Sequence, residues 1–207
     1  MNPNSESGKT IRLRDRLRGE TQAAILAAAE HVFAAEGLDR ARMESIAARA
    51  GVAVGTLYNH FQDREALLAA LVGARRDALL QRLDGALADV ARRPFEEALG
   101  ALLCALFEHW AAHRGLLSLL LLHAERPGSI ARTRGAILEE VTRRAESLLR
   151  RGREEGKVRP DGSGLQAVLL LGMVRGVLLH DAIHQGGGEV GERAGAVLEL
   201  FLRGAGS

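Results

Sequence analysis

The segment from residue 43 to residue 61 limits the possible folds of this chain more than any other. Two apolar patterns, at 43–50 and 54–61, each fit about two turns of helix and are separated by a glycine-containing turn. Gly51 allows the tight connection that joins two short helices. Neither helix is long enough to be stable alone, so both must pack on neighbours. The segment therefore predicts a helix-turn-helix with a shared core of Ile46, Ala47, Ala50, Val52, Leu57 and Phe61.

The composition favours helix along the whole chain. Hydrophobic residues make up 47% and aromatic residues only 3%. The apolar residues are mostly Leu and Ala, not the β-branched and aromatic types that strands prefer. We therefore expect an all-α protein. Apolar periodicity and end signals place helices at about 21–36, 43–50, 54–61, 64–83, 95–113, 116–125, 130–155, 164–184 and 190–202.

The chain is expected to have three parts. Residues 1–18 are polar, rich in arginine and without apolar periodicity, which predicts a flexible basic arm. This arm is either a solubilising terminus or a segment that reaches DNA phosphates or the minor groove. The helix that follows Asp63 is long enough to link two domains. We expect a three-helix helix-turn-helix domain at 19–76 and a larger C-terminal helical domain at 77–207.

The helix-turn-helix and its flanks carry a specific residue pattern. It consists of Ile46-Ala47, Ala50-Gly51-Val52, Gly55-Thr56-Leu57-Tyr58, His60-Phe61 and Arg64-Glu65-x-Leu67. This pattern resembles the signature of the tetracycline-repressor (TetR) family, closely over about 21–71, whereas the rest of the chain is similar only in organisation. The resemblance implies a homodimer that binds double-stranded operator DNA and responds to a small-molecule effector.

The resemblance also implies roles for the second helix of the motif. Its outward side chains include no carboxylate, so the helix can approach a phosphate-lined groove without repulsion. Its apolar positions could read only thymine methyl groups or groove shape. Ala53 and Arg42 stand where the family often has a capping Ser or Thr, so both helices should lack a side-chain cap. The expected phosphate contacts are Arg42, Thr56, Tyr58, His60 and Arg64, and Met43, Val54 and Gly55 would lie near base edges, with Asn59 on the same outward face.

A dimer interface is expected in the C-terminal half. A single short recognition helix touches few base pairs, so operator specificity normally requires a two-fold dimer. The best candidates are the helices at 130–155 and 165–184, whose counterparts in the family form a four-helix bundle. In the second of these, Gly172 and Gly176 lie about one turn apart and allow close approach. The alternative is an ordinary buried helix within one subunit.

The apolar segment 95–125 is expected to wall a ligand pocket, as the middle helices do in the family. Each candidate residue could instead be plain core. Arg175 interrupts an apolar stretch, where an unpaired buried charge would be costly. It would pair with a glutamate across the dimer, face an anionic ligand or reach solvent. The candidate ligand-binding residues are Leu103, Phe107, Trp110, His113, Leu117, Leu120, Met173 and Arg175.

The sequence gives little support for catalysis, a cofactor or a metal site. It has no Ser/His/Asp or Cys/His constellation and no phosphate-binding glycine loop, so we expect neither enzymatic activity nor a cofactor. His180 and His184 could form half of a metal site, but no third ligand is evident nearby. Cys104 is the only cysteine, so no intrachain disulfide is possible, and we expect a buried small residue and no redox sensor.

The class of protein follows from these features. The net charge of +2 does not by itself imply nucleic acid. The longest unbroken apolar stretches are far short of a membrane span of roughly 20 residues, and no apolar segment follows the basic N-terminus. We therefore expect a cytoplasmic, sequence-specific DNA-binding regulator without a membrane partner, and more specifically a repressor released when a small molecule binds its C-terminal domain. The alternative is a helical interaction or adaptor protein that does not bind DNA.

Overall fold

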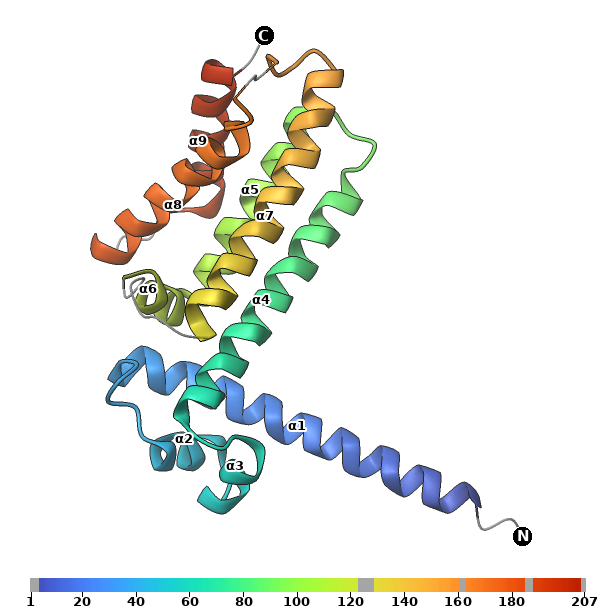
Figure 1. Cartoon of the computed structure of the whole chain (residues 1–207), viewed down its shortest axis with the longest axis vertical. Coiled ribbons are helices and arrows are strands. Elements are labelled where there is room, and N and C mark those ends of the chain that lie inside the picture. The colour runs from blue at the N-terminus through green and yellow to red at the C-terminus, as the bar shows by residue number, and fades with distance from the viewer. Residues whose placement is uncertain (1–3, 123–128, 161–162, 185–187, 206–207) are drawn as a thin grey trace. The chain divides into compact units, whose positions relative to one another are not determined.

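The computed structural model describes residues 4–122, 129–160, 163–184 and 188–205, and these ranges contain nine helices and no strand (Figure 1). The all-α prediction is confirmed. The helices are α1 (Asn4–Glu36), α2 (Met43–Ala50), α3 (Val54–His60), α4 (Arg64–Asp89), α5 (Phe95–Ala112), α6 (Arg114–Leu122), α7 (Ser129–Glu154), α8 (Gln166–His184) and α9 (Val190–Ala205).

The chain divides into two compact units, residues 1–71 and 72–207. The division falls inside α4, slightly before the boundary expected at 76. In the first unit, α2 packs against α1 and α3 packs against α2. The apolar stripe expected on α1 is buried, and it meets the shared core of the helix-turn-helix. The buried side chains include Ile25, Val32, Phe33, Ile46, Ala47, Leu57, Phe61, Leu67 and Leu71.

Helix α1 begins at Asn4, far before the start expected at Thr21. Thr21 is not a cap, because its hydroxyl donates to the carbonyl of Leu17 at 2.9 Å inside the helix. The prediction of a flexible arm is therefore wrong for residues 4–18, and residues 1–3 lie outside the described part. Residues 14–20 are exposed, which explains why they carry no apolar periodicity. A segment without apolar periodicity has no apolar face to bury, but it can still form a helix.

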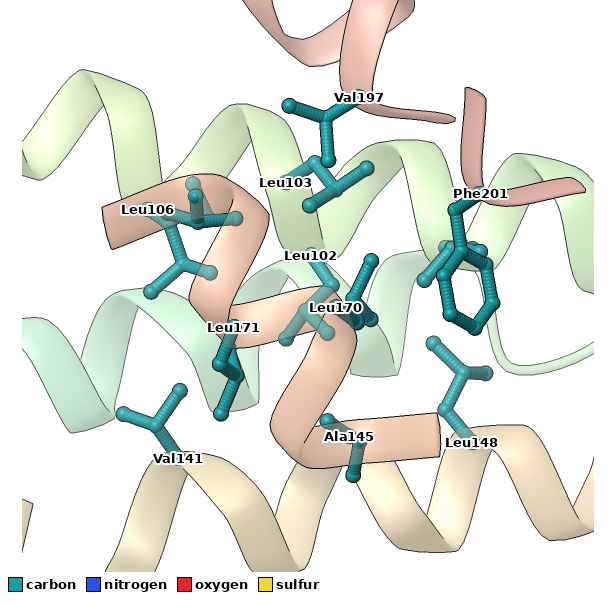
Figure 2. Packing of buried hydrophobic residues seen from close by; sticks show 14 of the residues in the cluster. Leu102, Leu103, Leu106, Val141, Ala145, Leu148, Leu170, Leu171, Val197 and Phe201 are labelled. Atoms are coloured by element: carbon teal, nitrogen blue, oxygen red, sulfur yellow. The ribbon is translucent and has the colours of Figure 1, made fainter. Parts of the chain in front are cut away.

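The second unit is a helical bundle with α5 at its centre. Helix α5 packs against α9 and α7, and α8 packs against α6, α7 and α9. Figure 2 shows how leucines of α5 meet side chains of the surrounding helices. The labelled members of this core are Leu102, Leu103 and Leu106 from α5, Val141, Ala145 and Leu148 from α7, Leu170 and Leu171 from α8, and Val197 and Phe201 from α9.

Two ion pairs join helices of the second unit. Arg144 on α7 donates to both carboxylate oxygens of Asp84 on α4, at 2.7 and 2.9 Å. These hydrogen bonds lower the pKa of Asp84. Asp181 on α8 is only 3% exposed, and it accepts a hydrogen bond of 2.8 Å from Arg193 on α9. A buried carboxylate without a partner would be strongly destabilising, so this pair fixes the position of α9 on α8.

Gly152 in α7 lies where no larger side chain fits. A Cβ atom there would lie 2.7 to 2.8 Å from ring atoms of Phe95, whose side chain is fully buried. We expect Gly152→Ala to lower the free energy of unfolding by about 1–3 kcal/mol, measured by urea denaturation. The control is Gly85→Ala in α4, where a Cβ meets nothing within 4 Å. It should be neutral or stabilising by up to about 1 kcal/mol, because alanine favours helix. An equal loss of unfolding free energy in both variants would contradict the close packing of Gly152 on Phe95.

Candidate functional site

The turn between α2 and α3 depends on one left-handed residue. Gly51 has φ +69°, a conformation that residues with a Cβ rarely adopt. Its amide donates to Ala48 at 3.2 Å, and the amide of Val52 donates to Ala47 at 3.1 Å. These bonds satisfy carbonyls at the end of α2, as in glycine-terminated helices generally. The predicted turn is therefore confirmed.

The helix caps also agree with the sequence. Arg42 and Ala53 precede α2 and α3, and neither makes a side-chain cap hydrogen bond. Asp63 does cap the following helix, because its Oδ1 accepts a hydrogen bond of 2.7 Å from the amide of Ala66. Helix α3 is thus held by its apolar contacts and by the well-capped helix that follows it.

The outward face of α3 is small, polar and without a negative charge. Tyr58 is 47% exposed and Val54 is 37% exposed, whereas Leu57 is fully buried. Gly55 and Asn59 are also exposed, and Thr56 and His60 are partly exposed. The hydroxyl, amide and imidazole groups of this face can all hydrogen-bond an anionic partner. The face is therefore chemically suited to phosphate oxygens.

Two of the expected DNA-binding residues have different surroundings from those predicted. Met43 is only 6% exposed and belongs to the core of the first unit, so its assignment to base edges is wrong. It is the first residue of α2, and its side chain is buried while those of Arg42 and Glu44 are exposed. Arg64 is partly buried and donates to the carbonyl of Asp39. It therefore helps to connect α4 to the loop after α1.

A cavity of about 620 Å³ lies within the second unit. Helices α5 and α6 contribute mainly leucines, with His109 and Trp110. The charged side chains come from α4, α7 and α8, and all of them are arginines. Among the described residues that line the cavity, none is acidic. The polar members of the lining are Arg75, Arg76, His109, Trp110, Arg134 and Arg175.

His109 is uncharged at neutral pH. Burial is the main reason that its pKa falls from 6.5 to about 4, and the neighbouring His113 and arginines Arg82 and Arg75 lower it further. The imidazole rings of His109 and His113 lie 4.9 Å apart. Beside it, Nε1 of Trp110 is buried and has no hydrogen-bond partner in the described part of the chain. The cavity therefore presents a neutral imidazole and a free indole donor among its arginines.

Comparison with known proteins identifies the type of helix-turn-helix. The sequence model of the bacterial regulatory proteins of the tetR family matches residues 25–71, which cover the helix-turn-helix. The transcriptional repressor BepR of Brucella suis is 40% identical over 57 residues, and this alignment covers 28% of the chain and 27% of BepR. The transcriptional regulator UidR of Escherichia coli K12 is 24% identical over 159 residues, or 76% of the chain and 80% of UidR. The helix-turn-helix of this chain is therefore of the TetR type.

The chain as a whole is similar to solved regulators in its fold. The structure of FadR from Bacillus subtilis, solved in complex with stearoyl-CoA, matches with a TM-score of 0.76 at 21% identity. The match covers 88% of the chain and 98% of FadR. The match of the helix-turn-helix and the curated relatives together support a DNA-binding transcriptional regulator, with a helix-turn-helix and a larger helical C-terminal unit. Proteins of this family are regulatory and are not classed as enzymes.

The cavity includes only some of the residues predicted for the ligand pocket. Trp110, Leu117, Leu120 and Arg175 line it. The other four do not. Leu103 and Phe107 belong to the core, Met173 packs partly buried against that core, and His113 contacts His109 outside the lining. The prediction missed Val72, Arg75, Arg76, Leu79, Leu106, His109, Leu121, Ala131, Arg134, Gly135, Ile137, Leu138 and Leu178.

The outward face of α8 carries an apolar stripe. Leu169 is 63% exposed and Ile183 is 57% exposed, and both glycines expected at an interface, Gly172 and Gly176, are exposed between them. Helix α9 adds Leu200, which is 63% exposed. The stripe is therefore not explained by packing within one chain. Its apolar members are Leu165, Val168, Leu169, Leu179 and Ile183.

Helix α7 offers a weaker apolar face, because Leu138, 58% exposed, is its one large apolar side chain that is exposed among the described residues. Its outward positions between 139 and 150 are Glu139, Arg143, Glu146, Ser147 and Arg150. The expected role of residues 130–155 in the interface is therefore not supported, because the apolar side of α7 is used within the second unit. The exposure pattern favours α8 with α9.

The apolar character of α8 also concerns the membrane prediction. By length and composition alone, α8 could cross a membrane, although no unbroken apolar stretch of the sequence is long enough for a span. One such helix is weak evidence, because core helices pass the same test. Arg175 lies in its middle, and Asp181 is buried against Arg193 of α9. These contacts belong to a helix packed in a bundle.

Two further features of the sequence analysis, the histidine pair of α8 and the single cysteine, have ordinary surroundings. The rings of His180 and His184 lie 4.5 Å apart, but no group of three or more His, Cys, Asp or Glu residues that could hold a metal ion occurs in the described ranges. Burial, with a smaller contribution from Glu108, raises the pKa of the Cys104 thiol. A raised pKa makes this cysteine less reactive, which agrees with a packing role.

Proposed function

We propose that this chain is a homodimeric repressor that binds operator DNA through α3 and leaves it when a small molecule fills the cavity of the second unit. The observation that carries the proposal is the outward face of α3, which offers hydrogen-bonding groups and no carboxylate within a helix-turn-helix of the TetR type. Thr56, Tyr58 and His60 contact phosphates, and Val54 and Gly55 approach base edges. Arg42 and Asn59 extend this surface.

The proposed dimer forms through α8 with α9. Two copies of the apolar stripe on α8 would cover each other across a two-fold axis, and the exposed glycines allow the helices to approach closely. A dimer places two recognition helices on the same side of the duplex, at the spacing of roughly 34 Å that one helical turn requires. Monomers would leave the stripe in contact with water.

Ligand control would act through α4. This helix is continuous from Arg64 to Asp89, so it begins in the helix-turn-helix unit and lines the cavity with Val72, Arg75, Arg76 and Leu79. A ligand that binds one position of α4 better than another shifts the separation of the two recognition helices. The structure of FadR, which is similar in fold, was solved in complex with stearoyl-CoA, so a protein of this fold can hold a ligand.

A regulator of this kind works in the cytoplasm, where its DNA lies, and it needs no cofactor. The competing function is a helical adaptor that does not bind DNA, which the apolar stripe on α8 alone would also permit. The two functions differ in their response to DNA.

The test is capture of genomic fragments by the purified full-length protein, followed by gel-shift analysis of the captured DNA. We expect enrichment of a fragment upstream of the chain's own gene, with an inverted repeat and with affinity that falls as salt is raised. A folded dimer that enriches no sequence over random genomic DNA would support the adaptor instead.

A further inference from the structure

We infer that the effector is an amphiphile with an anionic head group and an apolar tail. The inference rests on the proposed function, because it names the chemical class of molecule that fills the cavity. It is carried by the charge and the apolar surface of the cavity lining.

The charge of the lining has one sign. Arg75 and Arg76 come from α4, Arg134 from α7 and Arg175 from α8, and no described lining residue is a carboxylate. Burial, the neighbouring His113 and the nearby arginines lower the pKa of His109, so this histidine adds no further positive charge. The positive charge of the arginines is not neutralised by any other residue of the described lining. A bound anion would remove this imbalance.

Two of the arginines are available to a ligand. Arg175 makes no hydrogen bond or ion pair with any described residue, and its side chain is exposed. Nε of Arg76 is buried without a hydrogen-bond partner, and its Nη1 lies 3.5 Å from Asp77, a solvent-exposed neighbour in sequence. An exposed pair of this kind stabilises little. Arg134 is better held, because it donates to the carbonyl of Leu120 at 3.3 Å.

The rest of the lining is apolar. Leucines from α5 and α6, together with aliphatic residues of α4, α7 and α8, form most of the wall. The volume of about 620 Å³ lies within the usual range of ligand sites. A small inorganic anion would leave this apolar wall in contact with water, whereas an amphiphile would cover it and also meet the arginines. The apolar members are Val72, Leu79, Leu106, Leu117, Leu120, Leu121, Ile137, Leu138 and Leu178.

The same arginines exclude the opposite class of ligand. A lipophilic cation would enter a site with several guanidinium groups and no described carboxylate, and it would be repelled at short range in surroundings of low dielectric constant. A neutral amphiphile would gain the apolar contacts only. The expected order of affinity is therefore anion, neutral molecule, cation.

The test uses Trp110, the only tryptophan of the chain, as a reporter inside the cavity. Its fluorescence is followed while the full-length protein is titrated, below micelle formation, with dodecanoate, dodecan-1-ol and dodecyltrimethylammonium. Dodecanoyl-coenzyme A and free coenzyme A form a further arm, which distinguishes a carboxylate head from the phosphates of a thioester. We expect dodecanoate or its coenzyme A thioester to bind about tenfold more tightly than the alcohol, and the cation to bind least.

Variants locate the head group. Arg76→Gln and Arg175→Gln should each weaken binding of the anion by about tenfold and leave binding of the alcohol unchanged. Arg92→Gln removes the same charge at an exposed position outside the cavity lining. It should change neither the affinity for the anion nor the affinity for the alcohol. Equal effects of Arg76→Gln and Arg92→Gln on anion affinity would overturn the assignment. Tighter binding of the cation, or no response to any anion, would overturn it as well.

The readout separates this inference from the proposed function, because it contains no DNA. A protein that binds its operator but prefers the cation would refute only the ligand class. A protein that binds the anion but shows no sequence preference on DNA would refute only the proposed function.

Discussion

The double variant Thr56→Ala, Tyr58→Ala is expected to lower the affinity for operator DNA by about 100-fold, measured by fluorescence anisotropy at fixed salt. Both hydroxyls lie on the accessible face of α3, and each is proposed to hydrogen-bond a phosphate in both protomers of the dimer. Neither side chain belongs to the buried core of the first unit, so the helix-turn-helix should remain folded.

The control for this variant is Gln81→Ala, at an exposed position of α4 in the second unit. It should leave DNA affinity unchanged. The double variant should also keep the dimer and the Trp110 fluorescence of the wild type. If its affinity for the operator equals that of the wild type, α3 does not dock as proposed.

Leu169→Glu is expected to convert the dimer to a monomer at micromolar concentration, measured by sedimentation. Leu169 is 63% exposed in the middle of the apolar stripe on α8, and two-fold symmetry would bring a pair of new carboxylates into one interface. A monomer can hold only one half-site, so the affinity for the full operator should fall by about 100-fold or more.

Leu17→Glu is the matched control, because Leu17 is 50% exposed on α1 and does not belong to the stripe on α8. It should leave the oligomeric state unchanged. A monomeric wild type, or a Leu169→Glu variant that remains a dimer, would contradict the interface on α8.

The sequence predicts the helix-turn-helix well, for a local reason. Gly51 sets the turn, Asp63 caps the next helix and Leu57 fixes the buried side of α3, and each of these signals lies within a few residues of its effect. Met43 is the exception at this site. An apolar residue beside the motif can face either the core or the partner, and only the packing of α2 on α1 decides between them.

The cavity is less predictable, because its wall depends on which face of each helix meets a distant neighbour. Leu103 and Leu106 both lie on the apolar helix α5, but Leu103 belongs to the core beside α9 whereas Leu106 also lines the cavity. Helical periodicity does not distinguish these faces. Arg76 and Arg134 were missed for a related reason: arginines on long amphipathic helices are most often solvated, and nothing local marks the few that face a cavity.

The same limit applies to the dimer. The glycines of α8 are correctly expected on an exposed apolar face, since Gly172 and Gly176 lie between exposed apolar residues. The choice of α7 as the partner helix stays a prediction, and it is weakened because the buried apolar side of α7 is already used by α5 and α8, which the sequence does not show.

The most direct measurement for the central claim is the ratio of two affinities of the wild-type dimer. One is for the fragment captured from upstream of its own gene, and the other is for a scrambled duplex of the same length and composition, both at physiological salt. A sequence-specific regulator should bind the captured fragment at least about 1,000-fold more tightly. A ratio near one, with a folded dimer, would contradict the account.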